Sequence, residues 1–304
     1  MIRYLKHDAI DKSKWDNCIA GAVNSLLYGY SFYLDAIADN WDAVVVNDYE
    51  AVMPLTWRKK YFTAYLYQPP FTQQLGVFYK TPISKDIFSE IENVINAHFK
   101  FAEIFINHAN TGIFESSRSI PQVNYVLDIN RPYDIIHSGF LPGFTKSLRR
   151  IAKFNFAYNS SADIDTVISL YRNLYGNRVQ HLRESDFAAF KKCCARLQQQ
   201  DQLVIRHAAT ANGNLLAAVL LFKDEKRLYN IISCVTEEGK KMEVNYFLYD
   251  SIIREFCNSG RLLDLEGSDI KGVADFYIKM NPVNQPYSFY RYNHLPALMK
   301  LFKK

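Results

Sequence analysis

The chain has 304 residues, of which 49% are hydrophobic and 22% charged, so it is long enough for one large or two ordinary globular domains and too apolar for a disordered chain. Its net charge of +5 comes from 36 basic and 31 acidic residues, a balance that argues against the concentrated basic surface of a nucleic-acid-binding protein. The five cysteines are odd in number and none lies in a CxxC pair, which argues against a disulfide framework or a zinc site.

No secretory signal is visible in the opening residues, and the longest apolar run, at 215–222, is far too short to span a bilayer. We therefore expect a cytoplasmic protein with no membrane span and no metal site.

The first half of the chain begins with an apolar strand pattern at 2–5 and two helical stretches around 11–22 and 31–39. Apolar and alternating runs at 44–46, 50–57 and 61–67, separated by turn residues, predict an antiparallel meander. Helical spacing over 84–99, with Ser84 as the N-cap, is followed by strands at 101–107 and 122–129.

The second half repeats this order. It has a strand at 156–161, helices at 163–175 and 184–200, and two strands joined by Asn212-Gly213, a strong hairpin signal. A strand at 227–235, a helix at 241–257, a strand at 262–266 and a last strand at 287–292 complete it. The repeated order predicts two similar α/β domains (α+β, with mixed sheets), at 1–141 and 142–304, connected through the helical segment 131–155.

This element order resembles the fold of the GCN5-related N-acetyltransferases (GNAT), also called the acyl-CoA N-acyltransferase fold. Two tandem copies resemble the FemAB-like acyltransferases, including the Fem peptidoglycan peptidyltransferases. Three segments carry the likeness: "TKSLRRIAKFNFAYN" at 145–159, "NYFLYDSIIREFCNSGRLLDLEGS" at 245–268 and "VADFYIKM" at 273–280.

The resemblance implies transfer of an acyl or aminoacyl group to an amine bound in a cleft between the domains. It implies no tightly bound cofactor, with acyl-CoA or aminoacyl-tRNA as the donor, so tRNA is an expected partner. The acceptor would be a small molecule or one similar to a peptidoglycan precursor. The alternative is a tandem GNAT-fold protein that has lost catalysis and recognises a sugar, a peptide or a nucleotide-linked ligand.

Acyl transfer needs a base for the amine and an acid for the leaving group. Asp264 and Glu266 are two residues apart on a predicted strand, so they are expected to point to one face, and Glu266 is the candidate base. Tyr277 is the candidate acid, and Lys279 is a candidate ligand for a phosphate or carboxylate. The alternatives are a helix cap and a lysine partner for the two acids, and surface positions for Tyr277 and Lys279.

Two further segments are candidate binding sites. "TEEGKK" at 236–241 stands where enzymes of this fold grip the donor pyrophosphate, and it offers Gly239, Lys240 and Lys241. "YQPPFTQQLGVF" at 67–78 offers amides for a polar, extended substrate, with a basic strand end upstream. The candidate substrate-binding residues here are Gln68, Gln73, Gln74 and Arg58. The alternative is a rigid connector whose glutamines bind loop backbone.

Overall fold

The computed structural model describes residues 1–60, 63–114, 118–176, 182–267 and 270–296. The chain divides into two compact units. The N-terminal unit comprises Met1–Gln122 together with the segment that starts at Pro286, and the C-terminal unit comprises Val123–Gln285. This division differs from the predicted boundary between residues 141 and 142, because the strand at 125–128 pairs within the second sheet. The last strand of the chain also returns to the N-terminal unit.

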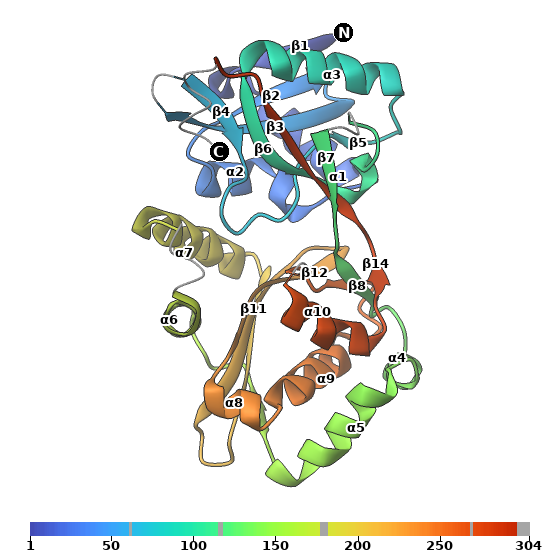
Figure 1. The fold of residues 1–304 in the computed structure, drawn as a ribbon, viewed down its shortest axis with the longest axis vertical. Helices are drawn as coiled ribbons and strands as arrows, with labels where there is room; N and C mark the ends of the chain where they lie inside the picture. Colours follow the sequence, from blue (N-terminus) through green and yellow to red (C-terminus); the bar gives the residue numbers. More distant parts are fainter. Residues whose placement is uncertain (61–62, 115–117, 177–181, 268–269, 297–304) are drawn as a thin grey trace. The chain divides into compact units, whose positions relative to one another are not determined.

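The N-terminal unit is a mixed α/β layer structure (Figure 1). Its helices and strands are β1 (Ile2–Leu5), α1 (Lys12–Gly21), α2 (Ser31–Ile37), β2 (Trp41–Val46), β3 (Ala51–Lys60), β4 (Thr63–Tyr67), β5 (Phe78–Tyr79), α3 (Lys85–His98), β6 (Phe101–Ile106), β7 (Ser119–Gln122) and β15 (Tyr287–Asn293). The main path of its sheet runs β1-β2-β3-β4-β6-β15-β7.

Helix α3 shows how the sequence pattern builds this unit. Ser84 accepts a hydrogen bond from the backbone N–H of Ile87 and caps the helix, as predicted. The helix then buries Phe88, Ile91 and Ile95 against the apolar face of the sheet.

The C-terminal unit repeats the plan. Its elements are β8 (Tyr125–Asp128), α4 (Tyr133–Ser138), α5 (Pro142–Ile151), β9 (Ala157–Asn159), α6 (Ile164–Tyr175), α7 (Glu184–Gln199), β10 (Leu203–Ala209), β11 (Leu215–Lys223), β12 (Arg227–Val235), α8 (Glu237–Lys241), α9 (Val244–Phe256), β13 (Leu262–Asp264), α10 (Lys271–Tyr277) and β14 (Val283–Asn284). The sheet order is β14-β8-β13-β12-β11-β10-β9.

Strand β11 explains why helices cover both faces of this second sheet. Its residues from Leu216 to Phe222 are all buried and apolar, so neither face can remain in water. In Figure 1, α6 and α7 lie on one side of these strands and α5, α9 and α10 on the other.

The two sheets exchange one strand each. Strand β8 follows the elements of the N-terminal unit in sequence but pairs with β13, whereas β15 follows the C-terminal unit and pairs with β6. Among the described strands, each sheet has one parallel pair, β4 with β6 in the first sheet and β12 with β13 in the second. The exchanged strand pairs antiparallel with the second member of that pair, β15 with β6 and β8 with β13. The predicted last strand at 287–292 therefore exists but belongs to the first unit.

The parallel pairs define equivalent positions in the two units. β4 pairs with β6 at Leu66 and Tyr67, and the last match is Tyr67 with Glu103. β12 pairs with β13 from Arg227 to Tyr229, and the last match is Tyr229 with Asp264. We call the point after each last match the strand junction; Gln68 and Asn230 are the residues that follow it.

Candidate functional site

A cavity of about 570 Å³ lies beyond the strand junction of the C-terminal unit. Strand β12 continues from Asn230 to Val235 after its pairing with β13 has ended, and on that side it has no partner strand among the described residues. Ser233 and Val235 line the cavity from β12. The remaining lining residues come from α6, from α8 and α9, and from α10 and the residue before it: Tyr171, Tyr175, Lys240, Asn245, Tyr249, Ile270, Gly272, Val273, Phe276 and Tyr277. We call this space the C-terminal cavity.

A buried polar cluster borders this cavity. The amide nitrogen of Asn230 donates to the hydroxyl oxygens of both Tyr249 and Tyr277, at 2.7 Å each. The two tyrosine oxygens are 3.2 Å apart, and the Tyr249 hydroxyl donates to Oγ of Ser233 at 3.3 Å. Both tyrosines are at most 4% exposed, so one amide from β12 fixes two phenols from two different helices.

The two phenols are held in their protonated form. Burial raises the pKa of Tyr249, and it raises the pKa of Tyr277 well above the ordinary value of 10.0. The neighbouring Tyr249 and the negative charge of Glu266 raise the pKa of Tyr277 further. At neutral pH the hydroxyl of Tyr277 is therefore protonated, so it can donate a hydrogen bond and can act as a general acid.

Two hydrogen-bond acceptors in this region lack a partner. The side-chain carbonyl oxygens of Asn230 and Asn245 are both buried without a hydrogen bond, and Asn245 lines the cavity. Buried acceptors are usually satisfied, so unpaired ones beside a cavity fit a ligand that supplies N–H or O–H groups.

The predicted pair Asp264 and Glu266 does not share a strand face, which corrects the sequence-based expectation. Strand β13 ends at Asp264, and Glu266 takes a left-handed conformation with φ of 43°, so the alternation of side chains stops between them. Glu266 is half-buried, and its charge acts on Tyr277.

Asp264 forms a buried ion pair with Arg227. Its carboxylate accepts from Arg227 at 2.7 Å and from the amide of Asn124 at 2.9 Å, and it is 1% exposed. Arg227 also donates to Gln285 at 2.8 Å. Asp264 thus ties β13 to β12 and to the segments that enter and leave the unit. This role is structural, but the partner is an arginine, and not the helix end or the lysine that were considered for the two acids.

The segment 236–241 forms the short helix α8, capped by Thr236. Gly239 is buried, and a Cβ there would lie 2.5 Å from the backbone oxygen of Leu216, so close packing requires glycine at this position. Its N–H donates to the Thr236 hydroxyl at 2.9 Å. Lys240 pairs with Glu237 and lines the C-terminal cavity, whereas Lys241 is exposed.

Lys279 follows α10 and lies outside the lining of the cavity. Its ammonium group donates to the hydroxyl of Tyr246 at 2.8 Å. The structure thus brings Tyr277 and Lys240 to one cavity, with Glu266 acting on Tyr277, and gives Lys279 a separate contact on α9.

The loop 68–77 of the N-terminal unit satisfies backbone groups of β6. Gln68 accepts from the N–H of Phe105 at 3.0 Å and donates to the oxygen of Thr72 at 2.9 Å. Gln74, which is 1% exposed, accepts from the N–H of His108 at 2.9 Å and donates to Gln73 at 2.6 Å. This arrangement is that of the alternative considered above, a rigid connector whose glutamines bind backbone.

Arg58, the fourth residue predicted to bind substrate, pairs with Asp39 at 2.7 Å. Its guanidinium group also lies 4.0 Å from the centre of the Tyr67 ring. These contacts hold it at the end of the β3–β4 pair.

The sequence interpretation missed Asn230, Ser233, Asn245 and Tyr249. The available signal was Asn230, an amide in the middle of the apolar run "RLYNIISCV", because a polar side chain buried in a strand requires a partner. Tyr249 lies among the apolar residues of α9 and gave no separate signal.

Comparisons with known proteins agree with this architecture. Residues 144–270 match the family model described as an acetyltransferase (GNAT) domain. The chain has a FemAB-like tandem GNAT fold. A search of curated proteins found no significant match.

Three solved structures illustrate the likeness over the whole chain. FemX is 11% identical with a TM-score of 0.66, and the match covers 99% of this chain and all of FemX. A tandem GNAT protein from the clavulanic acid biosynthesis pathway is 11% identical with a TM-score of 0.56, covering 98% of this chain and all of that protein. A C-terminal domain from Agrobacterium fabrum, assigned to a lysylphosphatidylglycerol synthetase, is 11% identical with a TM-score of 0.57, covering 96% and 94%. Among the described residues, no helix of this tandem GNAT chain is both long and apolar enough to cross a membrane.

Proposed function

We propose that the C-terminal unit transfers an acyl or aminoacyl group to an amine, with the reacting atoms in the C-terminal cavity. The observation that carries this proposal is the buried cluster of Asn230, Tyr249 and Tyr277 at the place where β12 and β13 stop pairing. A protonated phenol fixed at the edge of a cavity is suited to give its proton to a leaving group.

In the proposed reaction the amine nitrogen attacks the carbonyl carbon of the donor, and a C–N bond forms. The carboxylate of Glu266 takes the proton that the nitrogen loses, directly or through a water molecule. The bond from the carbonyl carbon to sulfur or oxygen then breaks, and the hydroxyl of Tyr277 protonates the leaving atom. Asn230 holds the Tyr277 oxygen in position through its 2.7 Å hydrogen bond.

The donor is an acyl-CoA thioester or an aminoacyl ester such as aminoacyl-tRNA. The raised pKa of Tyr277 favours the ester. A thiol has a pKa near ~8.5, so proton transfer from Tyr277 to a thiolate is uphill, whereas an alkoxide is a much stronger base and takes the proton readily. Lys240 lines the cavity and pairs with Glu237, so an anionic part of either donor would compete with that carboxylate for its ammonium group.

The acceptor is proposed to be an amine carried on a small molecule or on a peptidoglycan-like precursor. The names of the structural neighbours point to different acceptors, so the fold alone does not choose among them. The unpaired oxygens of Asn230 and Asn245 fit an acceptor or donor that presents amide N–H groups.

The test is a comparison of donors followed by substitution. Calorimetric titration of the full chain with acetyl-CoA and with an amide-linked alanyl-tRNA mimic identifies the donor. Turnover is then measured with the reactive form of the donor that binds, acetyl-CoA or ester-linked alanyl-tRNA, and with a lysine-containing pentapeptide as the acceptor. We expect Tyr277→Phe to keep the donor affinity and to lower turnover by about 10²–10⁴-fold, and Glu266→Gln to lower it as well.

Tyr246→Phe is the matched control, because Tyr246 lies on α9 like Tyr249 but bonds Lys279 outside the cavity. It should leave turnover unchanged. Full activity of Tyr277→Phe would remove Tyr277 from the mechanism. If neither donor binds, the catalytic proposal fails and the non-catalytic ligand-binding alternative takes its place.

A further inference from the structure

Helix α5 of the C-terminal unit has one buried side and one side in water. It packs against α9, which in turn packs on the strands of the second sheet (Figure 1). Its buried residues are Phe144, Ser147 and Ile151. The chain around it carries no acidic residue from Ile135 to Ala162, so any charge on the exposed side of the helix is positive.

The exposed side carries three cations. Lys146 and Arg149 belong to α5, and Lys153 lies in the helical turn that continues it. Spacings of three and four residues place these side chains on one face of the helix. All three are exposed, and none forms a salt bridge with a described residue, whereas the neighbouring Arg150 pairs with Glu243. The positive charge of this face is therefore not compensated by a carboxylate of the described residues.

Two aliphatic side chains lie exposed at the start of the same helix. Leu141, directly before α5, is 39% exposed, and Ile278 is 46% exposed. The two are neighbours in space, because the N–H of Leu141 donates to the carbonyl oxygen of Lys279 at 2.9 Å. Lys146 follows four residues after Pro142, roughly 6 Å along the helix axis. We call Leu141, Ile278, Lys146, Arg149 and Lys153 together the α5 face.

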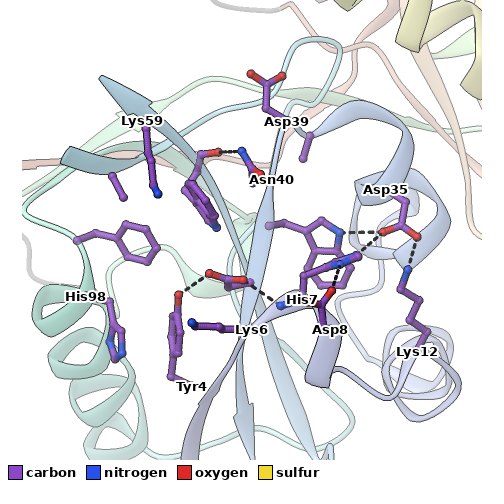
Figure 2. Close-up of a pocket in the computed structure, with 16 residues that line it drawn as sticks. Tyr4, Lys6, His7, Asp8, Lys12, Asp35, Asp39, Asn40, Lys59 and His98 are labelled. Atoms are coloured by element: carbon purple, nitrogen blue, oxygen red, sulfur yellow. Dashed lines mark hydrogen bonds and ion pairs between the residues drawn. The ribbon is translucent and has the colours of Figure 1, made fainter. Parts of the chain in front are cut away.

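The charges of the α5 face differ from those of the N-terminal pocket. That pocket, of about 710 Å³, has side chains of both signs around its walls, as Figure 2 shows. Its charged lining residues are Asp8, Asp35, Asp39, Asp42, Lys6, Lys12 and Lys59. The pocket thus has no excess of positive charge for an anionic partner, whereas the α5 face presents a single sign.

The combination of cations and aliphatic side chains fits an anionic lipid surface. Lipid phosphates and RNA phosphates both attract lysine and arginine. Only a bilayer also offers an apolar phase, into which aliphatic side chains such as Leu141 and Ile278 transfer favourably. The apolar stripe of α5 itself is buried in the protein, so contact with lipid is limited to the cations and to the aliphatic pair at the start of the helix.

We propose that the α5 face docks the C-terminal unit on the surface of an anionic lipid bilayer. Lys146, Arg149 and Lys153 contact lipid phosphates, and Leu141 and Ile278 enter the boundary between headgroups and acyl chains. This inference is independent of the acyl-transfer proposal, because none of these residues lines the C-terminal cavity and the test needs no turnover.

The test is co-sedimentation of the full chain with two kinds of vesicle, phosphatidylcholine alone and phosphatidylcholine mixed with phosphatidylglycerol. At low ionic strength we expect at least tenfold tighter binding to the mixed vesicles. This preference should decrease as salt screens the charges. Binding of uncharged (non-aminoacylated) tRNA is measured on the same preparation, because RNA is the competing class of partner.

Two variants separate the contributions of charge and apolar contact. Lys146→Gln/Arg149→Gln/Lys153→Gln should lose at least tenfold in affinity for the mixed vesicles. Leu141→Ser/Ile278→Ser keeps the charge and should lose at least fivefold, because its side chains no longer gain from entering lipid. Circular dichroism and urea unfolding should show that both variants remain folded.

Matched controls remove the same groups from other surfaces. Lys85→Gln/Lys100→Gln/Lys192→Gln removes three positive charges from exposed lysines outside the α5 face. Val23→Ser/Ile120→Ser removes two exposed aliphatic side chains of the N-terminal unit. Each control should change the affinity for mixed vesicles by less than threefold.

Several outcomes would overturn the proposal. Equal binding to both kinds of vesicle, or to neither, removes the anionic lipid surface as a partner. A triple glutamine variant of the α5 face that binds like the wild type, or no more weakly than its control, means that the contact is elsewhere or reflects net charge alone. A serine variant with unchanged affinity removes the apolar contact. Binding of tRNA that depends on the three cations, without binding of vesicles, makes the α5 face an RNA surface.

Discussion

The residue after the strand junction is an amide in both units, yet the two amides build different structures. In the N-terminal unit Gln68 bonds the backbone of β6 and of its own loop, and Leu75 then pairs with Ile106 as a further parallel bridge. In the C-terminal unit Asn230 bonds two phenols instead, and β12 continues beside an open cavity.

The difference shows how the same fold can either fill the strand junction with protein groups or leave a cavity beside it. A glutamine is long enough to reach the N–H of the neighbouring strand and to satisfy it, which closes the gap with protein groups. The shorter asparagine holds two phenols from α9 and α10 and keeps one acceptor unpaired. The tandem repeat therefore contains one junction suited to chemistry and one suited to stability.

The largest expected effect is on stability, and it concerns the acidic residue in the last match of each parallel pair. Asp264 is buried with Arg227, whereas its counterpart Glu103 forms a partly exposed pair with Arg291. Asp264→Asn leaves the Arg227 charge buried without compensation, so we expect a loss of about 3–5 kcal/mol in the free energy of unfolding. Urea unfolding measures it.

Asp201→Asn is the control for this variant, because the Asp201 side chain in the pair with Lys223 is solvent-exposed, so the loss of free energy of unfolding should be far smaller. A variant Asp264→Asn that keeps its stability but loses turnover would make Asp264 part of the reaction and not of the scaffold.

The next largest effects are the changes in stability and turnover when the amide of each unit is removed. Asn230→Ala and Gln74→Ala each leave buried polar groups unpaired, so each should cost about 1–3 kcal/mol in the free energy of unfolding. Only Asn230→Ala should also lower turnover, by about 10²-fold, because Tyr277 loses its fixed position. Unfolding in urea and donor turnover are measured on both variants.

The exposed Gln198→Ala on α7 serves as a control and should change stability by less than about 0.5 kcal/mol. Equal losses of turnover in Asn230→Ala and Gln74→Ala would mean that both junctions, or the whole chain acting together, contribute to the reaction.

Local patterns predicted most elements of the fold. The helical spacing and cap of α3, the Asn212-Gly213 turn between β10 and β11, and the repeated element order are all present in the structure. The strand exchange was not predictable in this way. β8 and β15 have the alternating or apolar patterns of ordinary strands, and such patterns do not say which of two sheets a strand joins.

The candidate site was predictable only where a residue stood out from its surroundings. Tyr277 and Lys240 were identified from the end of α10 and from the segment before α9, and both line the cavity. Asn230 and Tyr249 were missed because they lie in a strand and a helix whose patterns indicate core. Asp264 and Glu266 were paired on the assumption of a longer strand, whereas the chain turns directly after Asp264.

The smallest expected effect is on the pH dependence of stability, which should change when the phenol of Tyr277 is removed but not when the amide of Gln74 is removed. The folded-state pKa of Tyr277 lies above its unfolded value of about 10, so above that pH the unfolded chain binds fewer protons and stability falls as pH rises. Tyr277→Phe lacks this term. One pH unit above 10, the stability gap between wild type and Tyr277→Phe should therefore narrow by on the order of 1 kcal/mol relative to pH 8.

The difference in free energy of unfolding between wild type and Gln74→Ala should not change with pH, because an amide does not titrate. Urea unfolding at the two pH values decides the comparison. A Tyr277→Phe gap that stays constant would mean that Tyr277 ionises at its ordinary pKa, which would contradict its burial in the cluster and weaken its assignment as the proton donor of the C-terminal cavity.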